Sequence, residues 1–247
     1  MNSERYFRRP LGILAVATGA SVLAACASIM PTNAPGNRCS LSDGVLTLRG
    51  PTDQAMLDCV STSPGAATVR VRSPGGNVVT AMKIAERLHA MNAEFVVDGY
   101  CESSCANYFL PVARRIVVEP GARIVLHGSS DEHLLAKSGQ IEPFQQQRAF
   151  AERFHVPLGW LLYRTEAEFQ AGSNGRHVSG AVDTPPGDDR VVYIVVEERF
   201  LRSCYPHLDI EFRSETYTDR MRRDAPFRNR LARDGFYPSG SLECVRP

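Results

Sequence analysis

The stretch that decides the fold is residues 67–109, ATVRVRSPGGNVVTAMKIAERLHAMNAEFVVDGYCESSCANYF. Its first part, residues 67–73, alternates apolar and polar side chains, as a half-buried strand does. After PGGN, apolar residues keep helical spacing as far as Met91. A second strand is predicted at 94–100, directly before two cysteines and two adjacent serines. Strand, helix, strand and helix in this order predict an α/β fold with a parallel sheet core.

The same alternation of element types continues on both sides of this stretch. A strand is predicted at 44–50 and a short helix in QAMLDCV, which follows it. Two short β runs flank the Pro-Gly turn of RRIVVEPGARIVLHG, residues 114–128. We further expect helices at 142–154 and 158–169, a loop at 172–189, strand or helix at 190–201, and an irregular tail from Ser203.

Composition and charge exclude some classes of protein. The 247 residues are 43% hydrophobic and 22% charged, as in an ordinary globular protein. The formal net charge is +1 and no long run of like charge occurs, which argues against a nucleic-acid partner.

The first 25 residues have the features of an export signal. Three arginines precede an apolar run that is short for a membrane span and that ends in LAAC, with Cys26 last. This ending resembles the lipobox of bacterial lipoproteins, in which the signal is cut before the cysteine and the cysteine is lipidated. Ala27 in the next position implies a lipid-anchored protein of the bacterial cell envelope, at the outer membrane and facing the periplasm. The alternative is an ordinary signal peptide. Residues 26–38 are predicted to be a flexible tether.

The remaining cysteines are even in number, and an exported protein meets an oxidising environment, so disulfides are expected. Proximity along the chain favours three pairs: Cys39 with Cys59, Cys101 with Cys105, and Cys204 with Cys244. The spacing of cysteines and histidines does not suggest zinc, and no metal site is expected.

Three motifs stand at the ends of predicted strands: SPGG, CESSCA and IVLHG, the last of which contains His127. A glycine pair lets the backbone approach a ligand and direct N–H groups toward it. A serine at a helix N-terminus lies near unpaired N–H groups, where an oxyanion is stabilised. A histidine within reach of that serine can take its proton.

The chain resembles the proteolytic subunit of Clp protease and its signal peptide peptidase A relatives. The resemblance lies in three motifs that occur in the same order: SPGG, the serine turn and EPGARIVLH. The most similar are exported Clp-like proteins with a CxSxC motif. The resemblance covers about residues 44–170. It implies a ClpP/crotonase-like spiral of ββα units over residues 39–171, with 172–247 as a loop and a disulfide-pinned C-terminal extension packed on the same domain. It also implies a peptide or protein substrate, no cofactor, and self-association.

The resemblance assigns roles to particular residues. Gly76, beside Gly75, would offer a backbone N–H to the oxyanion. The nucleophile is Ser104 or Ser103. The peptidase A pattern overlays the segment from Ser104 to EPG without a gap, which favours Ser104, with the Cys105 N–H as second oxyanion donor. The CxSxC relatives place their serine at the position of Ser103.

The base and its orienting acid follow from the same resemblance. His127 matches the Clp base, although it lies 127 − 104 = 23 residues after Ser104, slightly less than the Clp spacing. Glu168, which precedes a phenylalanine, would take the place of the orienting acid, with Glu166 and Asp183 as alternatives. The peptidase A relatives use a lysine as base, and neither of the two lysines in this chain matches its position.

The expected activity is therefore that of a periplasmic serine peptidase. Three alternatives remain open at this stage: a non-catalytic member of the fold that binds peptides or envelope proteins, an acyl-CoA enzyme of the crotonase type, and a structural outer-membrane lipoprotein. A His127 too far from both serines would favour the non-catalytic binder.

Overall fold

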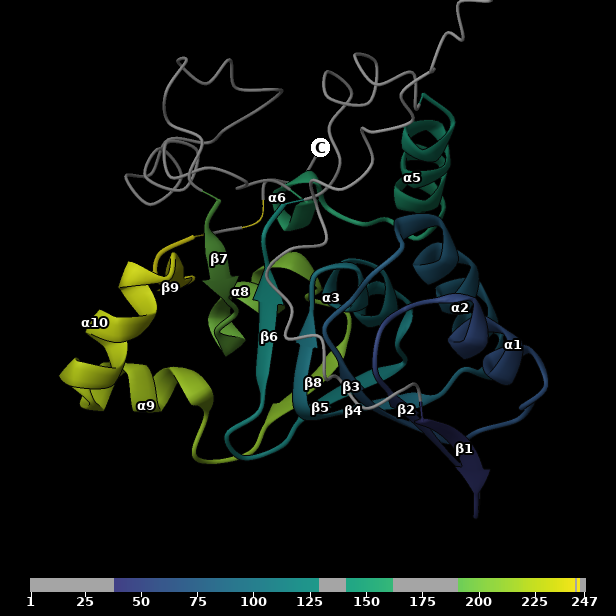
Figure 1. Ribbon diagram of the computed structural model, residues 1–247, viewed down its shortest axis with the longest axis horizontal. Coiled ribbons are helices and arrows are strands. Elements are labelled where there is room, and N and C mark those ends of the chain that lie inside the picture. Colours follow the sequence, from purple (N-terminus) through teal and green to yellow (C-terminus); the bar gives the residue numbers. More distant parts are fainter. Residues whose placement is uncertain (1–37, 129–140, 162–190, 243, 245–247) are drawn as a thin grey trace, which may run out of the picture. The chain divides into compact units, whose positions relative to one another are not determined.

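The protein combines a mostly parallel β-sheet with packed α-helices (Figure 1). The computed structural model describes residues 38–128, 141–161, 191–242 and 244. The predicted α/β class with a parallel core is confirmed. The predicted signal peptide and Cys26 lie outside the described residues. Among the described helices, none has the length and apolar character needed to cross a membrane.

The first four strands form one half of the sheet. β2 (Val45–Arg49), β3 (Thr68–Ser73) and β4 (Glu94–Glu102) are parallel neighbours in chain order. β1 (Arg38–Ser42) pairs with β2 in the antiparallel sense. The carboxyl ends of β2, β3 and β4 therefore meet at one edge of the sheet, where binding sites of α/β proteins usually lie.

The sheet divides beyond β4. The first part of β4 pairs with β5 (Arg115–Val118), and its last three residues pair with β6 (Arg123–Leu126). Three strands from the C-terminal part extend both branches: β8 (Asp209–Phe212) pairs with β5, β7 (Tyr193–Val195) with β6, and β9 (Phe236–Pro238) with β7. The end of β4 is thereby held directly beside β6.

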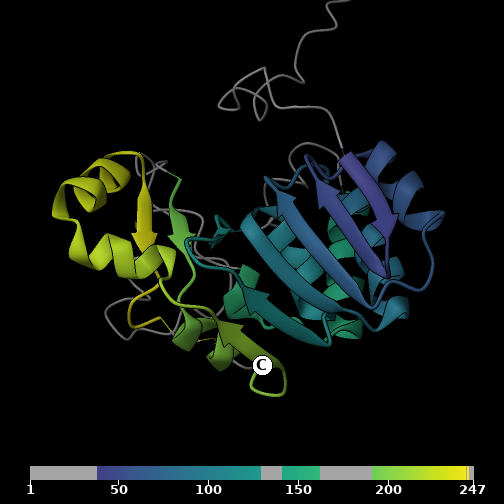
Figure 2. The same ribbon diagram turned by 90° about the horizontal axis from the view of Figure 1, so that it is seen from below.

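Helices α1 (Gln54–Ser61), α2 (Val78–Met91) and α3 (Ser104–Phe109) cover one face of the sheet (Figure 2). The alternation in β3 sets this arrangement, because Val69 and Val71 are fully buried between the sheet and the helices. Arg70 and Arg72, which alternate with these valines, lie on the other face, which carries ion pairs. Arg49, Arg70 and Arg72 surround the single carboxylate of Asp98 there.

Helix α3 is buried on all sides. Its six residues all lie in the core, and Pro111 converts the following turn into the 3₁₀ helix η1 (Leu110–Val112). The indole N–H of Trp160, in α6 (Leu158–Leu161), donates to the Ala106 carbonyl at 3.2 Å. The Tyr108 hydroxyl donates to Gln147 in α5 (Ile141–Arg153) at 2.9 Å. The helix that follows the two serines is therefore fixed by neighbours on two other helices.

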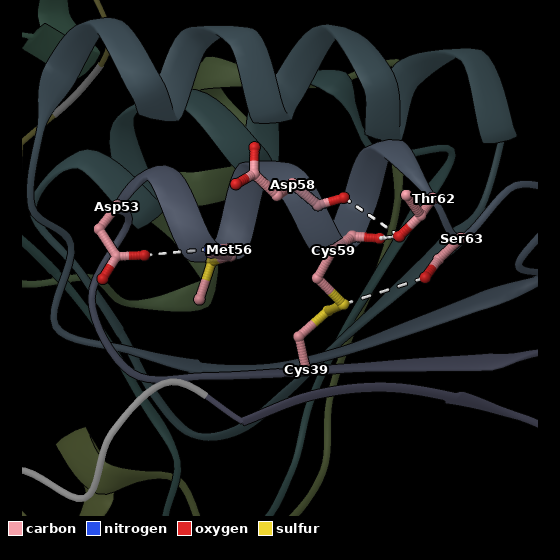
Figure 3. Close-up of a disulfide and its surroundings, with 7 residues drawn as sticks. All are labelled: Cys39, Asp53, Met56, Asp58, Cys59, Thr62 and Ser63. Atoms are coloured by element: carbon pink, nitrogen blue, oxygen red, sulfur yellow. Dashed lines mark hydrogen bonds between the residues drawn. A yellow bond between two sulfur atoms is a disulfide. The ribbon is translucent and has the colours of Figure 1, made fainter.

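All three predicted disulfides are present. Figure 3 shows the bond between Cys39 and Cys59, which ties β1 to α1. Helix α1 starts at its N-cap Asp53, whose carboxylate accepts the Met56 N–H at 3.0 Å. The disulfide thus anchors the first strand to a helix that begins just after β2.

The C-terminal tail differs from the expectation of an irregular segment. Residues 190–201 were expected to be strand or helix, and they contribute to both β7 and α8 (Glu198–Cys204). Helices α9 (Tyr217–Arg223) and α10 (Ala225–Arg233) follow β8. Each begins at a capping side chain, Thr216 and Asp224 respectively. Two short helices with good caps therefore form in a segment with few apolar residues.

Candidate active site

The two adjacent serines stand where β4 ends and α3 begins, and their environments differ. Ser103 lies between the two elements with φ 54° and ψ −128°, a conformation that residues other than glycine rarely adopt. Its N–H donates to the Val125 carbonyl of β6 at 2.9 Å. Its side chain does not cap α3. The Ser103 hydroxyl is thus presented by a sharp turn and is free of the usual capping role.

His127 contacts Ser103. It follows the last residue of β6, and its Nε2 atom lies 2.6 Å from the Ser103 Oγ atom. The imidazole also makes an edge-on contact with the Tyr193 ring, at 5.7 Å between centroids. Because β6 pairs with the end of β4, the sheet itself brings the histidine and the serine together. The pair has the geometry of a nucleophile and its general base.

Ser104 has a structural environment instead. It is 1% exposed, and its Oγ atom accepts the Gly76 N–H at 2.8 Å. The same hydroxyl lies 2.9 Å from Thr52 Oγ1 and 3.3 Å from the Gly76 carbonyl oxygen. The expectation that Ser104 is the serine paired with His127 is therefore corrected, since the histidine contacts Ser103. The reason is the turn, which brings Ser103 to His127 and leaves Ser104 with Thr52 and Gly76 as partners.

Two of the three expected oxyanion donors, Gly76 and Gly75, already have an acceptor. The Gly76 N–H donates to Ser104 and the Gly75 N–H donates to Ser73 Oγ at 3.1 Å. With Ser103 beside His127, the amide that directly follows the candidate nucleophile is that of Ser104, not of Cys105. Both residues are in the first turn of α3, where N–H groups have no acceptor within the helix.

The glycine pair of SPGG packs directly on the serine turn. Gly75 has φ +85°, and a Cβ atom built there would lie 2.6 Å from the Glu102 carbonyl oxygen and 2.7 Å from the Ser103 Cβ. Gly76 has φ +149°, and a Cβ atom built there would lie 3.0 Å from Thr52 Oγ1 and 3.1 Å from the Thr52 backbone nitrogen. No side chain fits at either position without displacement, which explains the glycines.

A disulfide and an ion pair flank the turn. Cys101 is bonded to Cys105, and both are fully buried. The Glu102 carboxylate pairs with Arg123 Nε at 2.6 Å. The guanidinium carbon of Arg123 lies 5.5 Å from the ring centroid of Tyr100 and 5.2 Å from that of Tyr217. The carboxylate of Glu102, the residue that directly precedes the two serines, is therefore held by an arginine.

Several predicted site residues cannot be placed. Glu168, Glu166 and Asp183 all fall in 162–190, outside the described residues. Thr52 was missed by the sequence reasoning, as was Tyr193. The signal for Thr52 was available, because it follows the carboxyl end of β2, beside the ends of β3 and β4. Across the described ranges, no group of three or more metal-ligating side chains occurs.

The sequence matches no protein-family model, and a search of curated proteins gives no significant match.

Proposed function

We propose that this protein is a serine hydrolase of the ClpP/crotonase-like type that cleaves peptide bonds, with Ser103 as nucleophile and His127 as general base. The observation that carries the proposal is the 2.6 Å contact between Ser103 Oγ and His127 Nε2. It is supported by the unusual backbone of Ser103, because strained turns that expose a hydroxyl are typical of activated serines. A His127 far from both serines would favour a non-catalytic binder, and His127 instead lies 2.6 Å from Ser103 Oγ.

The reaction would begin when Ser103 Oγ attacks the carbonyl carbon of the scissile bond. The hydroxyl proton passes to His127 Nε2, which then donates it to the leaving amine. Water, activated by the same histidine, hydrolyses the acyl-enzyme. No cofactor is required by this sequence of steps.

The Ser104 N–H is the first candidate for stabilising the oxyanion, because it directly follows the nucleophile. In the structure, the Gly76 N–H donates to Ser104 Oγ. It can therefore become the second oxyanion donor only when the substrate oxygen replaces Ser104 Oγ as its acceptor. Binding of a substrate carbonyl and rearrangement of the SPGG loop are thus expected to be coupled.

The hydrogen bond from the Gly76 N–H to Ser104 Oγ favours a second candidate function. In it, the protein is a non-catalytic member of the same fold that binds peptides or envelope proteins. In that case the hydroxyl of Ser104 would keep the oxyanion site permanently closed. Peptide binding without turnover would identify this function.

Hydrolysis is tested with the protein from Ala27 onward, after its disulfides have been confirmed. An unfolded, fluorescently labelled protein and a set of short activated esters serve as substrates. We expect turnover that is abolished by Ser103→Ala and lowered about 10²- to 10⁴-fold by His127→Ala. Hydrolysis that persists in Ser103→Ala would contradict the assignment of the nucleophile.

The proposed location is the periplasmic face of the outer membrane, where a lipid on Cys26 anchors the protein. Self-association, as in the Clp family, is also proposed. The support for the lipid anchor is the LAAC sequence after an apolar run. Cys26→Ser should move the full-length protein from the membrane fraction to the soluble periplasm. Retention of this variant in the membrane fraction would contradict lipid anchoring.

A further inference from the structure

The backbone of Ser103 needs support from its surroundings. With φ 54° and ψ −128°, this residue occupies a region that an L-amino acid enters at an energetic cost. Such a residue persists only where neighbouring structure holds it. A relaxed backbone would rotate the Ser103 hydroxyl away from His127 and break their hydrogen bond.

The bond between Cys101 and Cys105 is placed to supply this support. Cys101 lies within β4, where it is paired with Ser73 on one side and Ile124 on the other. Cys105 is the second residue of α3. The crosslink therefore joins a fixed strand to a buried helix, and Ser103 is the only residue between these two elements.

Noncovalent contacts with the SPGG loop also hold the turn. Gly75 packs on the backbone of Glu102 and Ser103, and the Ser104 hydroxyl is tied to Gly76. These contacts fix the turn against the SPGG loop. The Ser103 N–H adds a hydrogen bond to the Val125 carbonyl of β6. The disulfide is the covalent link between β4 and α3 across the turn.

We infer that the Cys101–Cys105 disulfide is a positioning device that holds Ser103 Oγ against His127. Its role in catalysis rests on the proposed function, whereas its effect on the geometry of the pair does not. The Cys39–Cys59 disulfide has no such role, because it joins β1 to α1 and does not bracket the serines. It is the matched control.

The experiment measures nitrogen chemical shifts of the His127 ring, assigned with His127→Ala, in the protein from Ala27 onward. In the native background, Ser103→Ala should shift these signals, because it removes their hydrogen-bond partner. In Cys101→Ala/Cys105→Ala the signals should already be shifted, and adding Ser103→Ala should cause no further change. In Cys39→Ala/Cys59→Ala they should be native, and Ser103→Ala should still shift them.

The rate of fluorophosphonate labelling of Ser103 is measured in the same proteins. Loss of the first pair of cysteines should lower it about 10²-fold, as a small displacement of a reacting group does. Loss of the control pair should leave it at the native rate. Adding His127→Ala should have little effect without the 101–105 bond, although it slows the native protein strongly.

The outcomes separate the two claims. Native His127 signals in Cys101→Ala/Cys105→Ala, still sensitive to Ser103→Ala, would overturn the inference whatever the labelling shows. The predicted pattern of shifts in a protein that never labels would support the inference and refute the proposed function. If the alanine pair does not fold, Cys101→Val/Cys105→Ala restores side-chain volume in the buried site and is judged by the same shifts.

Discussion

The Nε2 atom of His127 lies 2.6 Å from Ser103 Oγ, and the hydroxyl of the next residue, Ser104, is instead hydrogen-bonded to Thr52 and Gly76. Two identical side chains in adjacent positions therefore have different roles. Ser103 contacts a potential base, and Ser104 links its own helix to Thr52 and Gly76 in the core. This division follows from the turn at Ser103, and the predictions below depend on it.

Replacing Ser104 with alanine should destabilise the protein. The Gly76 N–H and the Thr52 hydroxyl would lose a buried partner, and an unsatisfied buried group costs about 1–3 kcal/mol. Thr52→Val combined with Ser104→Ala should cost less than the sum of the single changes, since each removes the partner of the other. Denaturant unfolding of the four proteins measures this coupling. Strict additivity would show that the two hydroxyls do not interact.

The disulfides should separate stability from reactivity. In the chain-entropy model, losing Cys39–Cys59, with a separation of 20 residues, costs about 3 kcal/mol. Losing Cys101–Cys105, with a separation of 4, costs about 2 kcal/mol. Unfolding of both double-alanine variants should therefore rank them in this order. The variant without Cys101–Cys105 should nevertheless show the slower labelling of Ser103. If the variant without Cys39–Cys59 is both the less stable and the slower to label, the shorter loop has no special role.

Gly75→Ala should disturb the serine turn. Its Cβ atom would meet the Glu102 carbonyl oxygen at 2.6 Å, so the SPGG loop or the turn must move. Gly65→Ala is the matched control, because Gly65 has a similar φ, +79°, and nothing within 4 Å. Both changes incur the left-handed backbone cost of about 1–2 kcal/mol.

Thermal unfolding should find Gly75→Ala less stable than Gly65→Ala, with reduced labelling of Ser103 only in the former. If the two variants unfold at the same temperature and label at the same rate, close packing between Gly75 and the turn does not matter.

The capping box of α9 should make a small, pH-dependent contribution to stability. Hydrogen bonds from the Thr216 hydroxyl and the Thr216 backbone N–H hold the pKa of the Asp219 carboxyl below its ordinary value. The folded-state pKa is therefore lower than the unfolded-state pKa, about 3.9. Its stabilising effect is present above that unfolded-state value and is lost as the pH falls through the folded-state value.

Asp219→Asn removes this effect. At neutral pH the variant should be less stable by under about 1 kcal/mol, because the carboxylate is partly exposed and water screens it. The difference should shrink below about pH 4. Urea unfolding of both proteins between neutral and acidic pH measures it, and a constant difference over that range would show that the carboxylate charge is not involved.

The sequence predicts much of the sheet and its helices, because those elements have clear periodicity. Val69 and Val71 alternate with arginines, and both are buried as expected for a strand with one solvent-exposed face. The three disulfides follow from proximity along the chain, since each pair joins neighbouring elements. The tail was harder, because α9 and α10 bury little more than Met221 and Phe227.

The choice between the two serines is not available from the sequence. Spacing to His127 differs by only one residue, and a strand–helix junction permits either side chain to face it. The deciding interactions are tertiary: the Ser103 N–H pairs with Val125 of β6, and Gly75 packs on the turn. Together with the Cys101–Cys105 disulfide, these contacts hold a positive φ at Ser103, which local propensity would not predict for serine.

The central claim is that Ser103 is an activated nucleophile. The direct test is covalent labelling of the oxidised protein from Ala27 onward with a fluorophosphonate probe, with the modified residue mapped by mass spectrometry. We predict modification at Ser103, abolished by Ser103→Ala, strongly slowed by His127→Ala, and still at Ser103 in Ser104→Ala. Modification at Ser104, or an unmodified folded protein with all three disulfides intact, would contradict the claim.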